Sequence, residues 1–96
     1  MDTITLAAKF SDDEILQITA LASERIKAGL WSHLERQTSE DYDRVLVLPI
    51  GRVAHYRIER DQTGWTYLLW CSPDTWQLLV CGTFDECLRL LSVTSK

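Results

Sequence analysis

The sequence lacks the features that mark a membrane protein, a secreted disulfide protein or a zinc protein. No apolar run approaches the ~20 residues that a transmembrane helix needs, and the N-terminus, MDTITLAAKF, carries an acidic residue early, unlike a signal peptide. The three cysteines are an odd number without CxxC spacing, which argues against a disulfide framework and a structural zinc site. We therefore expect reduced thiols, no membrane partner and a cytoplasmic protein.

Glycine-rich loops and paired metal ligands are also missing. The four glycines each stand alone, so no loop of the chain is suited to cradle phosphates. Neither His33 nor His55 has a second histidine four residues away, so we expect no metal site. We predict that Cys71 and Cys87 lie in the core, whereas Cys81 lies on the outer face without a histidine near enough to act as its base. These absences predict a protein that has no cofactor and is not an enzyme.

The composition that remains is typical of one small folded domain. The 96 residues, 46% hydrophobic and 25% charged, allow one core, so we predict a single domain over residues 1–96. The formal net charge of -4 is uneven, because residues 1–43 hold nine acidic and four basic residues and residues 44–96 hold five and six. This distribution weakens a nucleic-acid role for the whole chain but leaves room for a local basic patch.

Two capping boxes predict two helices. SDDE at 11–14 and TFDE at 83–86 each supply a hydroxyl that caps a helix and a glutamate that completes the box. The apolar stripes that follow are Ile15, Ile18, Ala22 and Ile26 in the first helix and Phe84, Cys87, Leu88 and Leu91 in the second. We place the end of the first helix between Ala28 and Arg36, because Gly29 can end it but apolar residues continue beyond.

The middle of the sequence predicts a four-stranded antiparallel meander. The apolar segments RVLVLPI, VAHYRIER, WTYLLWC and WQLLVC are separated by the turn signals GR, DQTG and SPDT. These turns predict the cross-strand pairs Ile50–Val53, Arg60–Trp65 and Cys71–Trp76. We therefore predict an α+β fold with an N-terminal helix, the four-stranded meander and a C-terminal helix, both helices packed on one face of the sheet.

These registers divide the predicted sheet into two faces. The face toward the helices contains Val45, Val47, Ala54, Tyr56, Ile58, Trp65, Tyr67, Leu69, Cys71, Trp76, Leu78 and Val80. On the opposite, outer face, Leu68, Trp70 and Leu79 form an apolar patch beside the polar residues His55 and Arg57. An exposed apolar patch is typical of an interaction surface. In the alternative interpretation, residues 30–43 fold over this patch and cover it.

From the patch we predict a small non-catalytic protein–protein interaction module, either a homodimer or an accessory subunit. Leu68, Trp70 and Leu79 are the predicted anchors, and His55 and Arg57 the polar rim of the partner-binding site. The last strand, WQLLVC, has no proline or lysine to prevent pairing at its edge. Either the N-terminal segment or another chain is therefore expected to pair with it.

Two other functions remain open. Arg57 beside Trp70 would suit nucleic acid, and the strands and capped helix around YRIERDQTGW and GTFDE resemble DNA-binding domains of the integrase-arm type. That resemblance implies DNA binding by the sheet. In the other alternative, the acidic start of the first helix and the EDYD segment present carboxylates to a basic site and inhibit a nucleic-acid enzyme.

Overall fold

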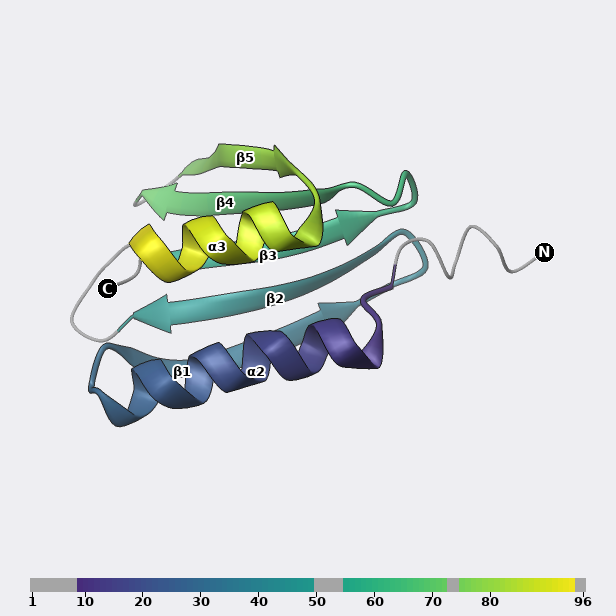
Figure 1. The fold of residues 1–96 in the computed structure, drawn as a ribbon. Helices are drawn as coiled ribbons and strands as arrows, with labels where there is room; N and C mark the ends of the chain where they lie inside the picture. The colour runs from purple at the N-terminus through teal and green to yellow at the C-terminus, as the bar shows by residue number, and fades with distance from the viewer. Residues whose placement is uncertain (1–8, 50–54, 73–74, 95–96) are drawn as a thin grey trace.

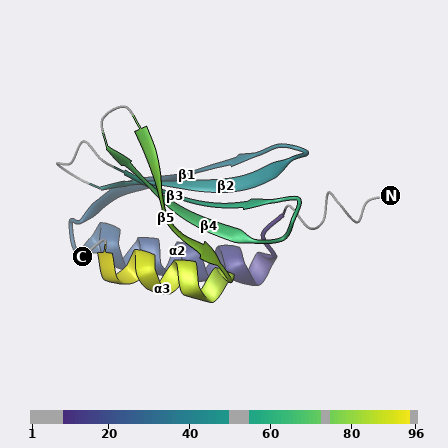
Figure 2. The ribbon, with the colours of Figure 1, turned by 90° about the horizontal axis from the view of Figure 1, so that it is seen from above.

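The protein folds into an antiparallel sheet with two helices on one of its faces (Figure 1, Figure 2). The computed structural model describes residues 9–49, 55–72 and 75–94. The elements are α2 (Asp12–Lys27), β1 (Trp31–Thr38), β2 (Tyr42–Pro49), β3 (His55–Asp61), β4 (Thr66–Ser72), β5 (Thr75–Gly82) and α3 (Phe84–Thr94). Strands pair in the order β1-β2-β3-β4-β5, so the predicted meander and α+β class are confirmed, but the sheet has five strands instead of four.

Both helices begin at the predicted capping boxes. The Glu14 N–H donates to Ser11 Oγ at 3.1 Å, and the Ser11 N–H donates to Glu14 Oε1 at 2.8 Å. At the start of α3, Glu86 N donates to Thr83 Oγ1 at 3.2 Å, and Thr83 N donates to Glu86 Oε1 at 3.1 Å. Each box satisfies N–H groups that the first helical turn leaves without backbone partners. In the described part of the chain, neither helix has the length and hydropathy to cross a membrane.

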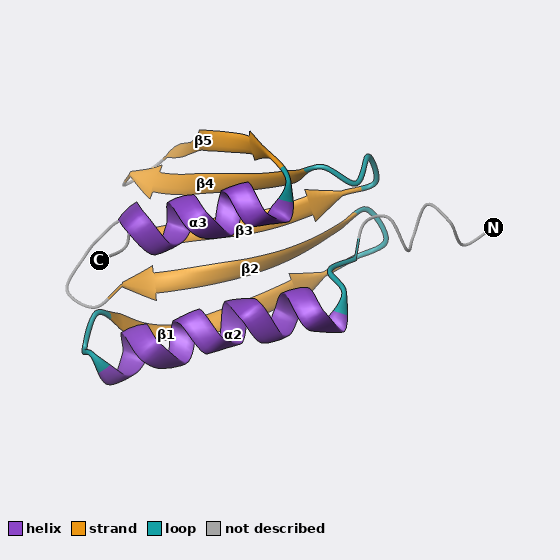
Figure 3. Ribbon diagram, viewed as in Figure 1, coloured by secondary structure: helices purple, strands orange, loops and turns teal. Residues whose placement is uncertain are grey.

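The segment after α2 is a strand that the sequence did not predict (Figure 3). Ala28 caps the helix, at the early limit of the predicted range, and Gly29 follows with a φ of 77°, a left-handed conformation that glycine adopts without steric cost. The chain then reverses and forms β1, in which Leu34 pairs with Val47 of β2. Residues 30–43 therefore widen the sheet, and the interpretation that they cover its outer face is wrong.

The core lies between the helices and the sheet. It consists of Phe10, Ile18, Ala22, Trp31, Val45, Val47, Tyr56, Ile58, Leu68, Phe84, Cys87 and Leu91. The β2 and β3 members of this list lie on the predicted face, because Val45 pairs with Ile58 and Val47 with Tyr56. The predicted pair Ile50–Val53 lies outside the described residues. Cys87 is buried in the core as predicted, and burial raises the pKa of its thiol to about 11.

The predicted register of the β3–β4 hairpin is wrong by one residue. Arg60 pairs with Thr66, not with Trp65. In the DQTG turn the Gly64 N–H donates to the Asp61 carbonyl at 3.0 Å, and Gly64 has a φ of 86°. The left-handed glycine adds one residue to the connection before pairing resumes. Because side chains alternate along a strand, this single residue exchanges the two faces of β4.

Two predicted partner-binding residues therefore lie on the helix side of the sheet. Leu68 is 0% exposed in the core, and Trp70 is half-buried against the same core, so the predicted position of both on the outer face is wrong. Tyr67, Leu69 and Cys71, which the sequence placed under the helices, lie on the outer face instead.

A β-bulge in β5 partly compensates for this shift. The pairs are Cys71–Trp76 and Leu69–Leu78 before the bulge and Leu68–Val80 after it. Leu79 is the extra residue, and it is 40% exposed at the bulge. Trp76 and Leu78 consequently lie on the outer face, contrary to prediction, whereas Val80 lies on the helix side as predicted.

Candidate interaction surface

Within the described residues, no helix covers the outer face of the sheet (Figure 2). Its side chains, from β1 to β5, are His33, Glu35, Gln37, Tyr42, Arg44, Leu46, Leu48, His55, Arg57, Glu59, Asp61, Tyr67, Leu69, Cys71, Trp76, Leu78 and Cys81. Two of them are arginines and three are carboxylates. This face therefore has no excess of positive charge, and its apolar members lie mainly toward β4 and β5.

Trp76 is the aromatic centre of this face. The Arg57 guanidinium carbon lies 4.4 Å from the Trp76 ring centroid, a cation–π contact. The His55 imidazole packs edge-on against the same indole, with ring centroids 4.9 Å apart and an interplanar angle of 83°. His55 and Arg57 thus lie on the outer face as the sequence predicted, but their aromatic neighbour is Trp76 and not Trp70.

A row of cross-strand partners continues the surface on either side of Arg57. Leu46 of β2 pairs with Arg57, Arg57 with Leu69, and Leu69 with Leu78. A second row joins His55, Cys71 and Trp76. Side chains directly opposite each other in a sheet contact one another, so the two rows form one continuous surface. We call it the outer band, and its members are Leu46, His55, Arg57, Leu69, Cys71, Trp76 and Leu78.

Arg57 is held in place by charge as well as by the indole. Glu59 Oε1 lies 3.0 Å from Arg57 Nε and 3.2 Å from Arg44 Nε, and all three side chains are mostly buried. Neither Nε–H makes a hydrogen bond to this oxygen, so the attraction is coulombic. Burial lowers the pKa of Arg57, Glu59 opposes this effect, and Arg44 adds to it. The guanidinium is therefore desolvated and fixed before any partner binds.

Cys71 lies on the outer face between His55 and Trp76, and its predicted position in the core is wrong. The error came from the β4 register, which also hid that Cys71 is the cross-strand partner of His55. Cys81 pairs with Tyr67, four residues along β4 from the partner of His55, so the predicted separation of Cys81 and His55 holds. Across residues 9–49, 55–72 and 75–94, no group of three His, Cys, Asp or Glu side chains is arranged to hold a metal ion.

The acidic EDYD segment does not present all of its carboxylates to solvent. Asp43 is fully buried, where it accepts hydrogen bonds from the Phe10 N–H at 2.9 Å and from Arg36 at 3.0 and 2.7 Å. Glu40 and Asp41 are exposed. Asp43 therefore acts as a structural bridge between the N-terminal segment and β1, which reduces the acidic surface available to an enzyme inhibitor.

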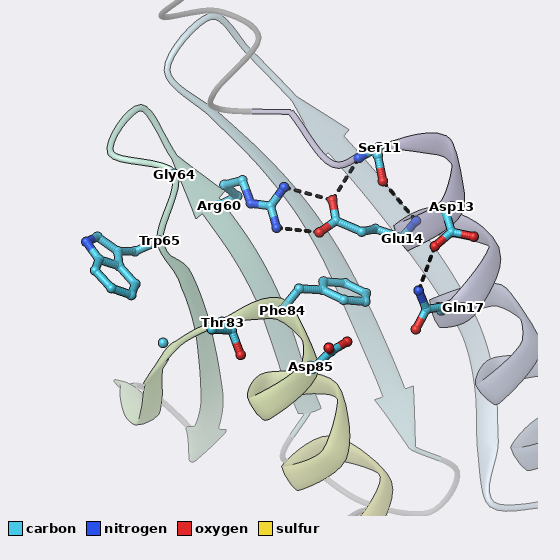
Figure 4. Close-up of a pocket in the computed structure, with 11 residues that line it drawn as sticks. Ser11, Asp13, Glu14, Gln17, Arg60, Gly64, Trp65, Thr83, Phe84 and Asp85 are labelled. Carbon is cyan, nitrogen blue, oxygen red and sulfur yellow. Dashed lines mark hydrogen bonds and ion pairs between the residues drawn. The ribbon is translucent and has the colours of Figure 1, made fainter.

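A separate cavity of about 570 Å³ lies between the N-terminal ends of α2 and α3 (Figure 4). At its edge the Arg60 guanidinium binds both carboxylate oxygens of Glu14, each at 2.7 Å. Arg60 also donates to the Lys9 carbonyl at 3.2 Å and to Thr66 Oγ1 at 3.1 and 3.4 Å. These contacts use all of the donors of a guanidinium. Arg60 therefore fastens α2 to the sheet and leaves no donor for an anionic ligand.

Glu14 makes this contact sensitive to acid. Burial alone would raise the pKa of Glu14, but hydrogen bonds from Arg60 and from the Ser11 N–H outweigh burial and lower it below the usual value of 4.5. The ionised carboxylate is thus favoured in the folded state. The stability that it contributes is fully present above pH 4.5 and is lost as the pH falls through the lowered pKa.

We expect Glu14→Gln to destabilise the protein at pH 7 by roughly 1–3 kcal/mol, because Arg60 loses its counter-charge. The variant should also lose less stability than wild type as the pH falls below 4.5. Urea unfolding midpoints across acidic pH measure both effects. The matched control is Asp13→Asn, an exposed change on the same helical turn. Parallel pH profiles for wild type and Glu14→Gln would contradict the expectation.

Comparisons of the chain with protein-family models, curated proteins and solved structures gave no match. The resemblance to DNA-binding domains of the integrase-arm type therefore has no support from these comparisons. A functional proposal depends on the surfaces of the molecule itself.

Proposed function

We propose that the protein is a non-catalytic interaction module whose outer band binds a partner protein. The observation that carries this proposal is the position of Arg57, held against Trp76 and flanked by leucines on a face that no described element covers. Tryptophan and arginine are the side chains most enriched at binding hot spots. Because Arg57 is already fixed, little side-chain entropy is lost when a partner packs against it.

The charges of the outer face favour a protein partner over nucleic acid. Binding to phosphates requires cations that can replace counterions, and its affinity falls steeply with salt. Here Arg44 and Arg57 share the counter-charge of Glu59, and carboxylates outnumber arginines on the described face. We therefore propose a partner that offers an apolar surface with few charges, and binding that changes little with salt.

The test compares Trp76→Asp with Trp65→Asp, because Trp65 is an exposed tryptophan outside the outer band. Wild type and both variants are immobilised, and the proteins that each retains from host extract, with and without nuclease treatment, are quantified at low and high salt. We expect a protein that wild type and Trp65→Asp retain equally and that Trp76→Asp binds at least ~30-fold more weakly, the loss typical of a hot spot. Circular dichroism checks that Trp76→Asp remains folded.

Two outcomes would contradict the proposal. Equal retention by Trp76→Asp would show that the outer band is not the binding surface. Retention that disappears after nuclease treatment or at high salt would instead favour nucleic acid as the ligand of this face.

A further inference from the structure

The two edges of the sheet differ in how well they are protected against pairing. β1 carries His33, Glu35 and Arg36 along its eight residues, and charged side chains hinder the addition of another strand. The sequence of β5, TWQLLVCG, has neither a charged residue nor a proline. In the part of the chain that the structure describes, no strand pairs with its free side (Figure 1). β5 is therefore the edge at which a further strand can be added.

An apolar groove lies beside this edge on the helix side. It has a volume of about 320 Å³ and is lined by Val80 of β5 and by Glu86, Arg89, Leu90 and Val93 of α3. Val93 is exposed there. A strand added to β5 would cover apolar side chains of the groove and of the strand itself. Glu86 and Arg89 carry opposite charges, so two copies of this surface can meet without net repulsion.

Because of the bulge, the β5 strands of two copies can pair with each other about a point between two residues. If two antiparallel β5 strands are centred between Leu78 and Leu79, the opposed pairs are Trp76–Cys81, Gln77–Val80 and Thr75–Gly82. Trp76 and Cys81 both lie on the outer face, and Gln77 and Val80 both lie on the helix side. Two residues that pair across antiparallel strands must have their side chains on the same face of the sheet. If a strand without a bulge paired with itself about a point between two residues, each pair would join residues of opposite faces. The extra residue at the bulge removes this mismatch along the whole strand.

We propose that the protein forms a symmetric dimer in which the β5 strands of two copies pair antiparallel and join both sheets into one. α3 packs over β4 and beside β5. With strands spaced ~4.8 Å apart, the two β4 strands would lie ~14 Å apart across the twofold axis of the dimer. The two α3 helices, each ~10 Å in diameter and packed over β4, would then lie on either side of this axis. Each α3 then covers the groove of the other copy. This dimer does not depend on the partner proposed for the outer band.

The oligomeric state of Leu79→Lys tests the proposal. Lysine at the bulge puts two like charges at the twofold axis, so we expect the dimer dissociation constant to rise at least ~100-fold by sedimentation velocity, about 2.7 kcal/mol. The matched control is Leu16→Lys on the exposed side of α2, where the same change should leave the dimer intact. A monomeric wild type at high micromolar concentration, or a Leu79→Lys variant that dimerises as wild type does, would overturn the proposal.

Disulfide cross-linking tests the register. In a Cys71→Ser background, which removes the thiol beside position 76 in the same chain, Trp76→Cys should form a disulfide with Cys81 of the second copy under mild oxidation. Gln77→Cys, on the opposite face of β5, should not. Cross-linking by Gln77→Cys instead would overturn the register. A chain that dimerises only after residues 1–8 are removed would show that its own N-terminal segment occupies the edge, and would overturn the dimer.

Discussion

Leu68→Asp is expected to unfold the protein, whereas Leu78→Asp in the adjacent strand is expected to change the stability of the monomer, measured at low protein concentration, by less than ~1 kcal/mol. Leu68 is 0% exposed in the core, and Leu78 is 56% exposed on the outer face. The first change removes buried apolar surface and places a carboxylate in the apolar core. Together these effects cost at least ~4–5 kcal/mol, a large part of the ~5–15 kcal/mol that stabilises a small domain.

Together, the two variants distinguish the register of β4 and β5 in the structure from the register that the sequence predicted. Urea unfolding followed by circular dichroism gives the free energy of unfolding for each variant under the same conditions. With the register predicted from the sequence, Leu68 would be exposed and Leu78 buried, so the order of the two effects would reverse. Equal losses, or a greater loss from Leu78→Asp, would therefore contradict the register of the structure.

The helices were predictable because their signals are local. Ser11 with Glu14, and Thr83 with Glu86, satisfy backbone N–H groups within one turn, so their effect does not depend on the rest of the fold. The face of β3 was predictable for a similar reason. Strict alternation of apolar and polar residues assigns His55 and Arg57 to one side, whatever strand lies next to them.

β1 was missed because its sequence lacks that alternation. In WSHLERQT only Trp31 and Leu34 are apolar, and a strand at a sheet edge with one face in solvent needs few apolar residues. Trp31 and Leu34 are spaced as helical neighbours are, so they favoured an extension of α2. The nearby Gly29 was the better signal, because a glycine that follows a helix typically ends it.

The face on which each side chain of β4 and β5 lies depends on insertions of a single residue. The alternation of apolar and polar residues in the sequence does not reveal such insertions. Gly64 in the left-handed conformation lengthens a turn by one position, and the bulge at Leu79 inserts another. Nearly every residue of YLLW and WQLLV is apolar, so the sequence gives no preference for either face. Trp76 and Leu78 were assigned to the core for this reason, although they contribute the aromatic and apolar parts of the outer band.

Trp31→Ala is expected to lower the free energy of unfolding by about 3–5 kcal/mol, the usual cost of deleting a buried aromatic side chain. Trp31 begins the strand that the sequence did not reveal, and it is 0% exposed in the core cluster that α2 and the sheet share. Its removal leaves a large cavity that neighbouring side chains fill only in part. The matched control is Trp65→Ala, because Trp65 is 54% exposed and its loss should cost less than ~1 kcal/mol.

Trp31→Phe distinguishes the contribution of Trp31 packing to stability from the cost of burying its Nε1–H group. The Trp31 Nε1–H is buried and has no hydrogen-bond partner among the residues that the structure describes, so the indole carries a desolvation cost that phenylalanine does not. We therefore expect Trp31→Phe to recover more than half of the stability that Trp31→Ala loses. Urea unfolding of the three variants beside wild type measures these differences. If Trp31→Ala were as mild as Trp65→Ala, the start of β1 would not be part of the core, and β1 would lack its main buried side chain.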